Sequence, residues 1–173
     1  VMLIIASTGP QIGTQIREVK REGVDVLVAL DISNSMLARD VRPNRLDRAK
    51  FEARQLFSRL RGDRVGMIVF AGTSHLYLPF TGDYDAARLF LDAVETSMIQ
   101  IQGTALAHAI NLATESFPDD DSKFRTLILF TDGEDHEGDV SAAVESAKRE
   151  GIVIHVAGMG SQDHVPIPVI NSM

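Results

Sequence analysis

The sequence predicts an α/β protein with three layers in a Rossmann-like arrangement: a mostly parallel central sheet with one antiparallel edge strand, and helices on both faces. Short apolar runs typical of buried strands alternate with longer segments whose apolar residues recur at helical spacing. Such alternation produces right-handed crossovers and a parallel sheet. A chain of 173 residues that is 45% hydrophobic and 24% charged is expected to form one complete core.

The first half of the chain predicts two buried strands with a helix between them. Residues 24–32 are a nearly continuous apolar run, and residues 64–71 are a second one. Pro43 and Asn44 introduce the helix, and Gly62 ends it. Its apolar positions follow helical spacing: Leu46, Ala49, Ala53, Leu56, Phe57 and Leu60.

A third strand follows the turn at residues 72–74. Leu76, Leu78 and Phe80 alternate there with more polar positions, which predicts a strand that runs antiparallel to its predecessor. Pro79 lacks the N–H group that a central strand would donate. We therefore expect this strand at a sheet edge.

The second half repeats the alternation of helix and strand. Helices are predicted over residues 83–95 and 104–116, with a loop around 98–102 between them. Residues 125–131 and 152–157 are predicted strands. The helix between those two strands is marked by apolar residues at Val140, Ala143, Val144 and Ala147.

Two regions are expected along the chain. Residues 1–23 form a membrane-proximal lead-in segment, in which the apolar run 1–6 is the end of a transmembrane helix and the rest is a linker with a basic patch near Arg17. The alternative for the apolar run is a strand or a disordered start. The alternative for the basic patch is the solvated face of a short segment. Residues 24–173 form one domain, which we expect to be truncated at its C-terminal end.

Charge and composition exclude several kinds of site. The net charge of −7 and the isoelectric point near 5.1 argue against a nucleic-acid surface, which needs clustered Lys and Arg. The absence of cysteine excludes disulfides, thiolate zinc sites and cysteine nucleophiles. An acidic protein of this kind is better suited to bind cations.

Five polar residues are predicted to converge where the strands end. Asp31, Ser33 and Ser35 leave the first strand as D-x-S-x-S, Thr104 begins a helix after Gly103, and Asp132 follows the strand at 125–131. Ligands bind at the carboxyl ends of strands in open α/β sheets. Alternate spacing directs the first three side chains to one point if the backbone stays extended or turns gently.

This set of oxygen atoms suits a hard divalent cation. Two carboxylates and three hydroxyls match Mg²⁺ in octahedral geometry, with Mn²⁺ or Ca²⁺ as alternatives, and they disfavour soft metals. If some of these residues act through water, at least one coordination position stays open to an outside ligand. Without a cation, Asp31 and Asp132 would face each other as like charges at a cost in free energy.

The ordered trio of D-x-S-x-S, threonine after glycine and T-D-G resembles the metal-ion-dependent adhesion site (MIDAS) of von Willebrand factor A (vWA) domains, over roughly residues 24–160. The resemblance implies that Ser33 and Ser35 ligate the ion directly. It implies that Thr104 ligates directly or through water, and that Asp31 and Asp132 act largely through water. A partner protein then supplies a Glu or Asp to complete the shell.

The chain also resembles the bacterial aerotolerance (Bat) membrane proteins, of the BatA and BatB kind, in residues 10–13, 17–23, 35–37 and the run D-V-R-P-N-R-L-D-R-A-K at 40–50. This resemblance implies flanking transmembrane helices, an inner-membrane location and a periplasmic vWA domain. Basic residues after the apolar run favour the cytoplasm instead. The implied partners are a sibling vWA protein, repeat-containing scaffold proteins or a MoxR-type ATPase. Ala105 departs from the acidic residue that many vWA domains carry.

We therefore expect a non-enzymatic domain that binds a partner protein through a metal ion. The alternative is a Mg²⁺-dependent phosphohydrolase, but no second aspartate follows Asp31 by two residues, and neither a P-loop nor a G-x-S-x-G motif occurs. A scaffold with a vestigial metal site is a third reading. The acidic run 132–137 and the residues 119–121 are expected to be solvated loops, although the first could hold a second cation.

Overall fold

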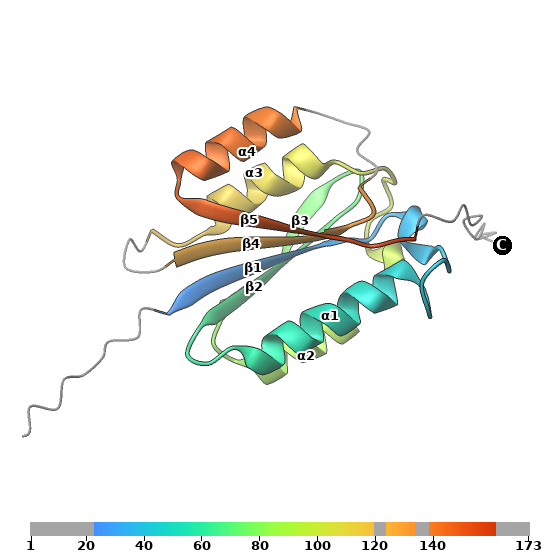
Figure 1. The fold of residues 1–173 in the computed structure, drawn as a ribbon, viewed down its shortest axis with the longest axis horizontal. Helices are drawn as coiled ribbons and strands as arrows, with labels where there is room; N and C mark the ends of the chain where they lie inside the picture. Colours follow the sequence, from blue (N-terminus) through green and yellow to red (C-terminus); the bar gives the residue numbers. More distant parts are fainter. Residues whose placement is uncertain (1–22, 120–123, 134–138, 162–173) are drawn as a thin grey trace, which may run out of the picture.

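The computed structural model describes residues 23–119, 124–133 and 139–161, and these residues contain one five-stranded sheet. The strands lie in the order β3-β2-β1-β4-β5 (Figure 1). Four of them are parallel, and β3 alone pairs antiparallel, with β2. Their bounds are β1 Val24–Asp31, β2 Arg64–Phe70, β3 Ser74–Thr81, β4 Phe124–Thr131 and β5 Ile152–Gly158.

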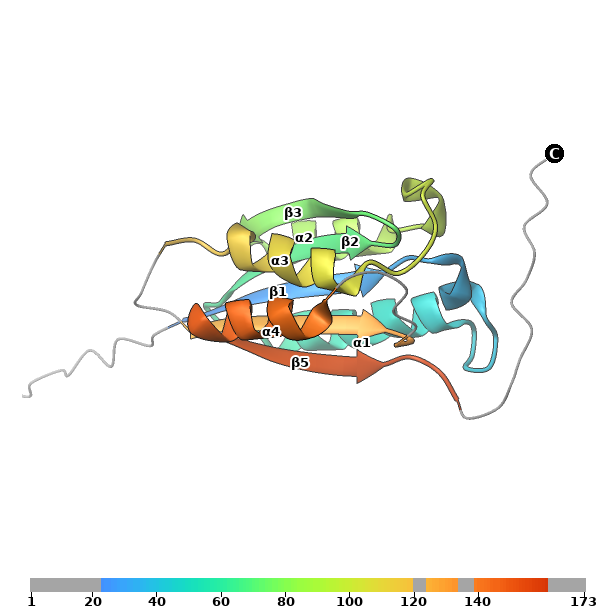
Figure 2. The same ribbon diagram turned by 90° about the horizontal axis from the view of Figure 1, so that it is seen from above.

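Helices cover both faces of this sheet, as the sequence predicts. In Figures 1 and 2, α1 and α2 lie against one face and α3 and α4 lie against the other. Two short 3₁₀ helices, η1 and η2, lie in loops. The bounds are η1 Asn34–Leu37, α1 Arg45–Arg59, α2 Tyr84–Asp92, η2 Thr96–Met98, α3 Leu106–Ser116 and α4 Val140–Arg149.

The central strand β1 separates two apolar clusters. Val26, Val28 and Leu30 face the cluster under α1 and α2, whereas Leu27 and Ala29 face the cluster under α3 and α4. Successive strand residues point to opposite faces, so a strand covered on both faces must be apolar throughout. This explains the continuous apolar run that the sequence shows there.

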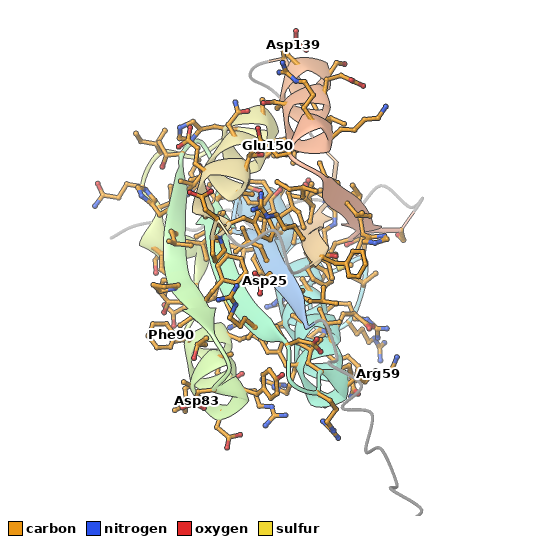
Figure 3. All side chains as sticks on the ribbon, turned by 90° about the vertical axis from the view of Figure 1, so that its left-hand side faces the viewer. Asp25, Arg59, Asp83, Phe90, Asp139 and Glu150 are labelled. Carbon is orange, nitrogen blue, oxygen red and sulfur yellow. The ribbon has the colours of Figure 1, made fainter. Side chains whose placement is uncertain are left out.

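One polar residue interrupts the run. Asp25 is 1% exposed, and its carboxylate accepts two hydrogen bonds from the Arg64 guanidinium, at 2.7 and 2.6 Å. Figure 3, which faces the end of the sheet where β1 begins, shows Asp25 on this central strand. The paired guanidinium offsets the cost of burying this carboxylate, so Asp25 does not disrupt the strand.

The strand order reverses at β1, which pairs in parallel with both β2 and β4. Strands β2 and β3 lie on one side of β1, and β4 and β5 lie on the other, so the strand order reverses between β1 and β4, the place where open α/β sheets bind ligands. The D-x-S-x-S motif follows β1, and Asp132 follows β4. The fold thus brings these two parts of the predicted site to one end of the sheet.

The structure corrects two predicted helix boundaries. The helix predicted over 83–95 ends at Asp92, because the Lys50 ammonium donates hydrogen bonds to the carbonyls of Asp92 and Val94. The helix predicted over 104–116 begins only at Leu106, because the Ala105 N–H group donates to the Ala71 carbonyl at 2.7 Å. Thr104 therefore lies in the loop before α3.

The predicted edge position of Pro79 is confirmed, since β3 is an outer strand. Of the predicted lead-in segment 1–23, only Gly23 lies within the described residues. None of the helices that the structure describes is long and apolar enough to cross a membrane.

Candidate metal centre

The base of the candidate site is the Asp31 carboxylate at the end of β1. Asp31 is fully buried, and one of its oxygens accepts a hydrogen bond from the Ser33 N–H group at 2.9 Å. The other oxygen accepts a hydrogen bond from the Thr131 hydroxyl at 2.8 Å. These bonds hold the carboxylate between β1 and β4 in a single orientation.

The two serine hydroxyls lie side by side above this carboxylate. The Ser33 Oγ and Ser35 Oγ atoms are 2.9 Å apart, and the two residues are 4% and 8% exposed. Ser33 precedes the first turn of η1, and the Met36 N–H group donates to its carbonyl. The serines are therefore brought together by a tight 3₁₀ turn, where the sequence predicted extended or gently turning backbone.

Thr104, the third predicted hydroxyl ligand, lies on a loop that is anchored at both ends. The Gly72 N–H group donates to the Ile101 carbonyl at 3.0 Å, and Ala105 donates to the end of β2. The Gln102 side chain accepts a hydrogen bond from the Asn34 N–H group at 2.9 Å, which ties this loop to the serine turn. Thr104 itself is 3% exposed.

Asp132 follows β4 and forms an ion pair that the sequence did not predict. Its Oδ2 atom accepts a hydrogen bond from the Arg45 guanidinium at 2.8 Å, and its side chain is 2% exposed. Arg45 is the first residue of α1. The same guanidinium donates two further bonds to Asp40, at 2.9 and 3.1 Å.

The acidic groups differ in their affinity for protons. Burial raises the pKa of Asp31 to about 6, although hydrogen bonds from Ser33 and Thr131 oppose this rise, and the nearby charge of Asp132 adds to it. The Arg45 guanidinium holds the pKa of Asp40 down at about 2. Thus neutral hydrogen-bond donors contact the buried Asp31 carboxylate, whereas Asp40 and Asp132 both pair with the Arg45 guanidinium.

The donor set fits a hard divalent cation. Within the described residues Asp31 forms no ion pair with Lys, Arg or His, so its charge is offset only by neutral hydrogen-bond donors. No group of three or more His, Cys, Asp or Glu side chains in the same residues is placed to hold a metal ion, so a cation here would depend on hydroxyl as well as carboxylate oxygens. Carboxylate and hydroxyl oxygens suit Mg²⁺, Mn²⁺ or Ca²⁺.

Comparison with known sequences places this arrangement in a family. The sequence model of the von Willebrand factor type A domain matches residues 26–134, a range that contains all five predicted site residues. The chain belongs to this family. Its vWA fold is the predicted three-layer arrangement, in which a mostly parallel sheet has one antiparallel edge strand.

Two solved bacterial structures resemble this vWA domain over most of its length. A solved structure described as the conserved hypothetical protein BatB from Bacteroides thetaiotaomicron is 49% identical, with a TM-score of 0.83, and the match covers 87% of this chain and 73% of that one. An aerotolerance-related membrane protein from Bacteroides fragilis is 48% identical, with a TM-score of 0.82, over 87% and 74% of the two chains. The predicted resemblance to Bat proteins is confirmed.

Two more distant similarities say less about this chain. A UPF0353 protein from Mycolicibacterium paratuberculosis is 31% identical over 94% of this chain, and the chain spans about half the length of that relative, 52%. Proximal thread matrix protein 1 from the mussel byssus, solved with a zinc-occupied MIDAS motif, is 18% identical, with a TM-score of 0.69 over 79% and 38% of the two chains. This last likeness is one of fold alone.

The vWA structure also identifies residues around the site that sequence reasoning missed. Thr131 holds Asp31, Gln102 ties the Thr104 loop to the serine turn, and Arg45 pairs with Asp132. Thr131 stands in the T-D-G motif, and Arg45 stands in the run at 40–50, so both positions carried a signal in the sequence. Of the acidic run 132–137, residues 134–137 lie outside the described residues.

Proposed function

We propose that this vWA domain binds an acidic group of a partner protein through one divalent cation. The cation, Mg²⁺ first and Mn²⁺ or Ca²⁺ by the same chemistry, would be held by Asp31, Ser33, Ser35, Thr104 and Asp132. The observation that carries this proposal is the pair of serine hydroxyls, 2.9 Å apart, beside a buried carboxylate that has no cationic partner among the described residues.

The balance of charge around the site favours an anionic ligand. Hydroxyl ligands supply no charge, and Asp132 already shares its charge with Arg45. A bound divalent cation would therefore keep part of its positive charge and could accept a carboxylate from outside. The partner's Glu or Asp would complete the coordination shell.

The distribution of charge along the chain supports an acidic partner. Residues 39–64, which follow the serine turn and include α1, contain nine Lys and Arg but only four Asp and Glu, a net charge of +5. The remaining residues together carry −12, because the whole chain has a net charge of −7. The segment next to the site is thus basic within an acidic protein, which would attract an acidic partner surface.

The setting that we propose follows from the likeness to Bat proteins. The domain would belong to a bacterial inner-membrane protein and face the periplasm, anchored by transmembrane helices on either side. Its partners would be a sibling vWA protein, repeat-containing scaffold proteins or a MoxR-type ATPase. The membrane description of the Bacteroides fragilis relative supports the first part of this setting.

We further propose that the domain is not an enzyme. Ser33 occupies the position two residues after Asp31 where a second aspartate would serve phosphoryl chemistry, and Asp132 is engaged by Arg45. Such a site offers ligands but no positioned general base. Incubation with a generic phosphate ester and Mg²⁺ should give no turnover, and turnover that Asp132→Ala abolishes would overturn this part.

The proposed function is tested by capture of partners from membranes. The immobilised domain is exposed to detergent extracts of the native membrane in Mg²⁺ and in excess EDTA, with Ser33→Ala as a parallel sample. Proteins that the wild type retains in Mg²⁺ are then purified and titrated against the wild type and the variant, in Mg²⁺ and in EDTA. Equal affinity of such a protein in Mg²⁺ and in EDTA would refute metal-bridged binding.

A further inference from the structure

Arg45 joins four separate segments of the molecule beside the candidate site. It begins α1, contacts Asp132 after β4 and contacts Asp40 in the loop before α1. The Ser161 N–H group, after β5, donates to the same Asp40 carboxylate at 2.7 Å. The Arg45 side chain is 14% exposed, and the Asp40 and Asp132 side chains that it joins are 0% and 2% exposed.

Asp40 fixes the position of the guanidinium. Two parallel N–H donors of Arg45 reach the two oxygens of Asp40, which is the bidentate geometry that orients a guanidinium most strongly. Gly160 closes the other side, since a Cβ atom there would lie 3.4 Å from both the Arg45 Nε and the Asp40 Oδ2 atoms. The third donor of Arg45 is left to contact Asp132.

We propose that Arg45 is a built-in competitor of the metal ion at Asp132. In the metal-free domain its guanidinium compensates the Asp132 carboxylate and so lowers the affinity of the site for a bare divalent cation. This inference rests on the proposed function and deepens it: a partner carboxylate must add its own charge before the cation binds tightly, so the site would bind metal and partner together.

The chemistry of arginine explains why this competitor is effective. A guanidinium stays protonated at any physiological pH, so the competing charge is permanent. Because Asp40 and Gly160 hold the guanidinium in place, it cannot swing into solvent when a metal ion binds. A fixed positive charge this close to a divalent ion disfavours it by Coulomb repulsion, the more so because the surrounding residues are buried.

The test is a calorimetric titration of Mg²⁺ into the domain without any partner. Arg45→Gln should bind Mg²⁺ about tenfold more tightly than the wild type, because one positive charge beside the site is removed. Arg59→Gln is the matched control: it removes the same charge from the same helix, but 14 residues along α1, about 21 Å away. Its affinity should stay within about twofold of the wild type, since salt screens that distance.

A second variant guards against misfolding. Arg45→Gln combined with Asp40→Asn leaves no unpaired charge at position 40, keeps the net charge of the chain and should also tighten Mg²⁺ binding. A folded variant that binds Mg²⁺ no more tightly than the wild type would overturn the inference and leave the proposed function standing. If none of these proteins binds Mg²⁺, Mn²⁺ or Ca²⁺, the proposed function fails and the inference fails with it.

Discussion

At the scale of single residues, the main feature of the site is the buried Asp31 carboxylate, which accepts hydrogen bonds from neutral donors. Asp31 is fully buried, and its pKa lies at about 6 mainly because of burial. The folded domain therefore keeps this proton up to about pH 6, whereas the unfolded chain releases it near pH 3.8. The contribution of Asp31 to stability is complete below pH 3.8 and is lost as the pH rises to about 6.

This pH dependence can be measured on the metal-free domain. Between pH 4 and pH 7 the ionisation of Asp31 should lower the free energy of unfolding by about 2 kcal/mol, and Asp31→Asn should remove that loss. Urea unfolding in EDTA at several pH values gives the comparison. If the difference between variant and wild type is the same at pH 4 and at pH 7, Asp31 does not titrate as we describe.

Thr131 is the neutral donor that reaches Asp31 from the neighbouring strand. Thr131→Val keeps the shape but removes the hydrogen bond to the carboxylate, which should lower the stability at pH 8 by about 2 kcal/mol and raise the pKa of Asp31 further. The matched control is Thr126→Val on the same strand. Equal losses from the two substitutions would contradict a special role for Thr131.

At the scale of elements, the position of Thr104 depends on how closely its loop approaches β2. A Cβ atom at Gly72 would lie 2.7 to 2.8 Å from atoms of Ile101 and Gln102, two of them backbone oxygens. Gly103 has a φ of +129°, a region that other residues rarely adopt. The two glycines thus let the loop that carries Thr104 pack against the turn that follows β2.

Gly72→Ala should push this loop away. We expect a loss of about 1–3 kcal/mol in stability from the overpacked contact. We also expect weaker Mg²⁺ binding, because Thr104 is displaced. Gly82→Ala is the control, since nothing lies within 4 Å of a Cβ atom there. Thermal unfolding and calorimetry on both variants check the expectation, which fails if Gly72→Ala binds Mg²⁺ as the wild type does.

The elements themselves were largely predictable, because each depends on a local pattern. The apolar run of β1 and the helical spacing of α1 appear directly in the sequence. The boundaries of α2 and α3 were wrong because distant groups set them: Lys50 ends α2, and the Ala71 carbonyl holds the start of α3. The same holds for the Arg45–Asp132 pair, whose members are 87 positions apart.

At the scale of the whole molecule, topology explains why the meeting of polar residues after β1 and β4 could be predicted. Parallel strands end at one edge of the sheet, so polar residues after β1 and β4 had to meet there. What the topology does not specify is the network of compensating charges. Asp40, Arg45 and Asp132 come together only through the register of α1 against the sheet and the loop after β5.

The central claim is that one divalent cation binds among Ser33, Ser35 and Thr104, with Asp31 and Asp132 within reach of its shell. The most direct measurement is an anomalous difference map from crystals of the domain grown with Mn²⁺, compared with crystals of the Ser33→Ala variant. We predict one strong peak at that position in the wild type and none there in the variant. A wild-type map without a peak at these residues, or with its strongest peak elsewhere, would contradict the account.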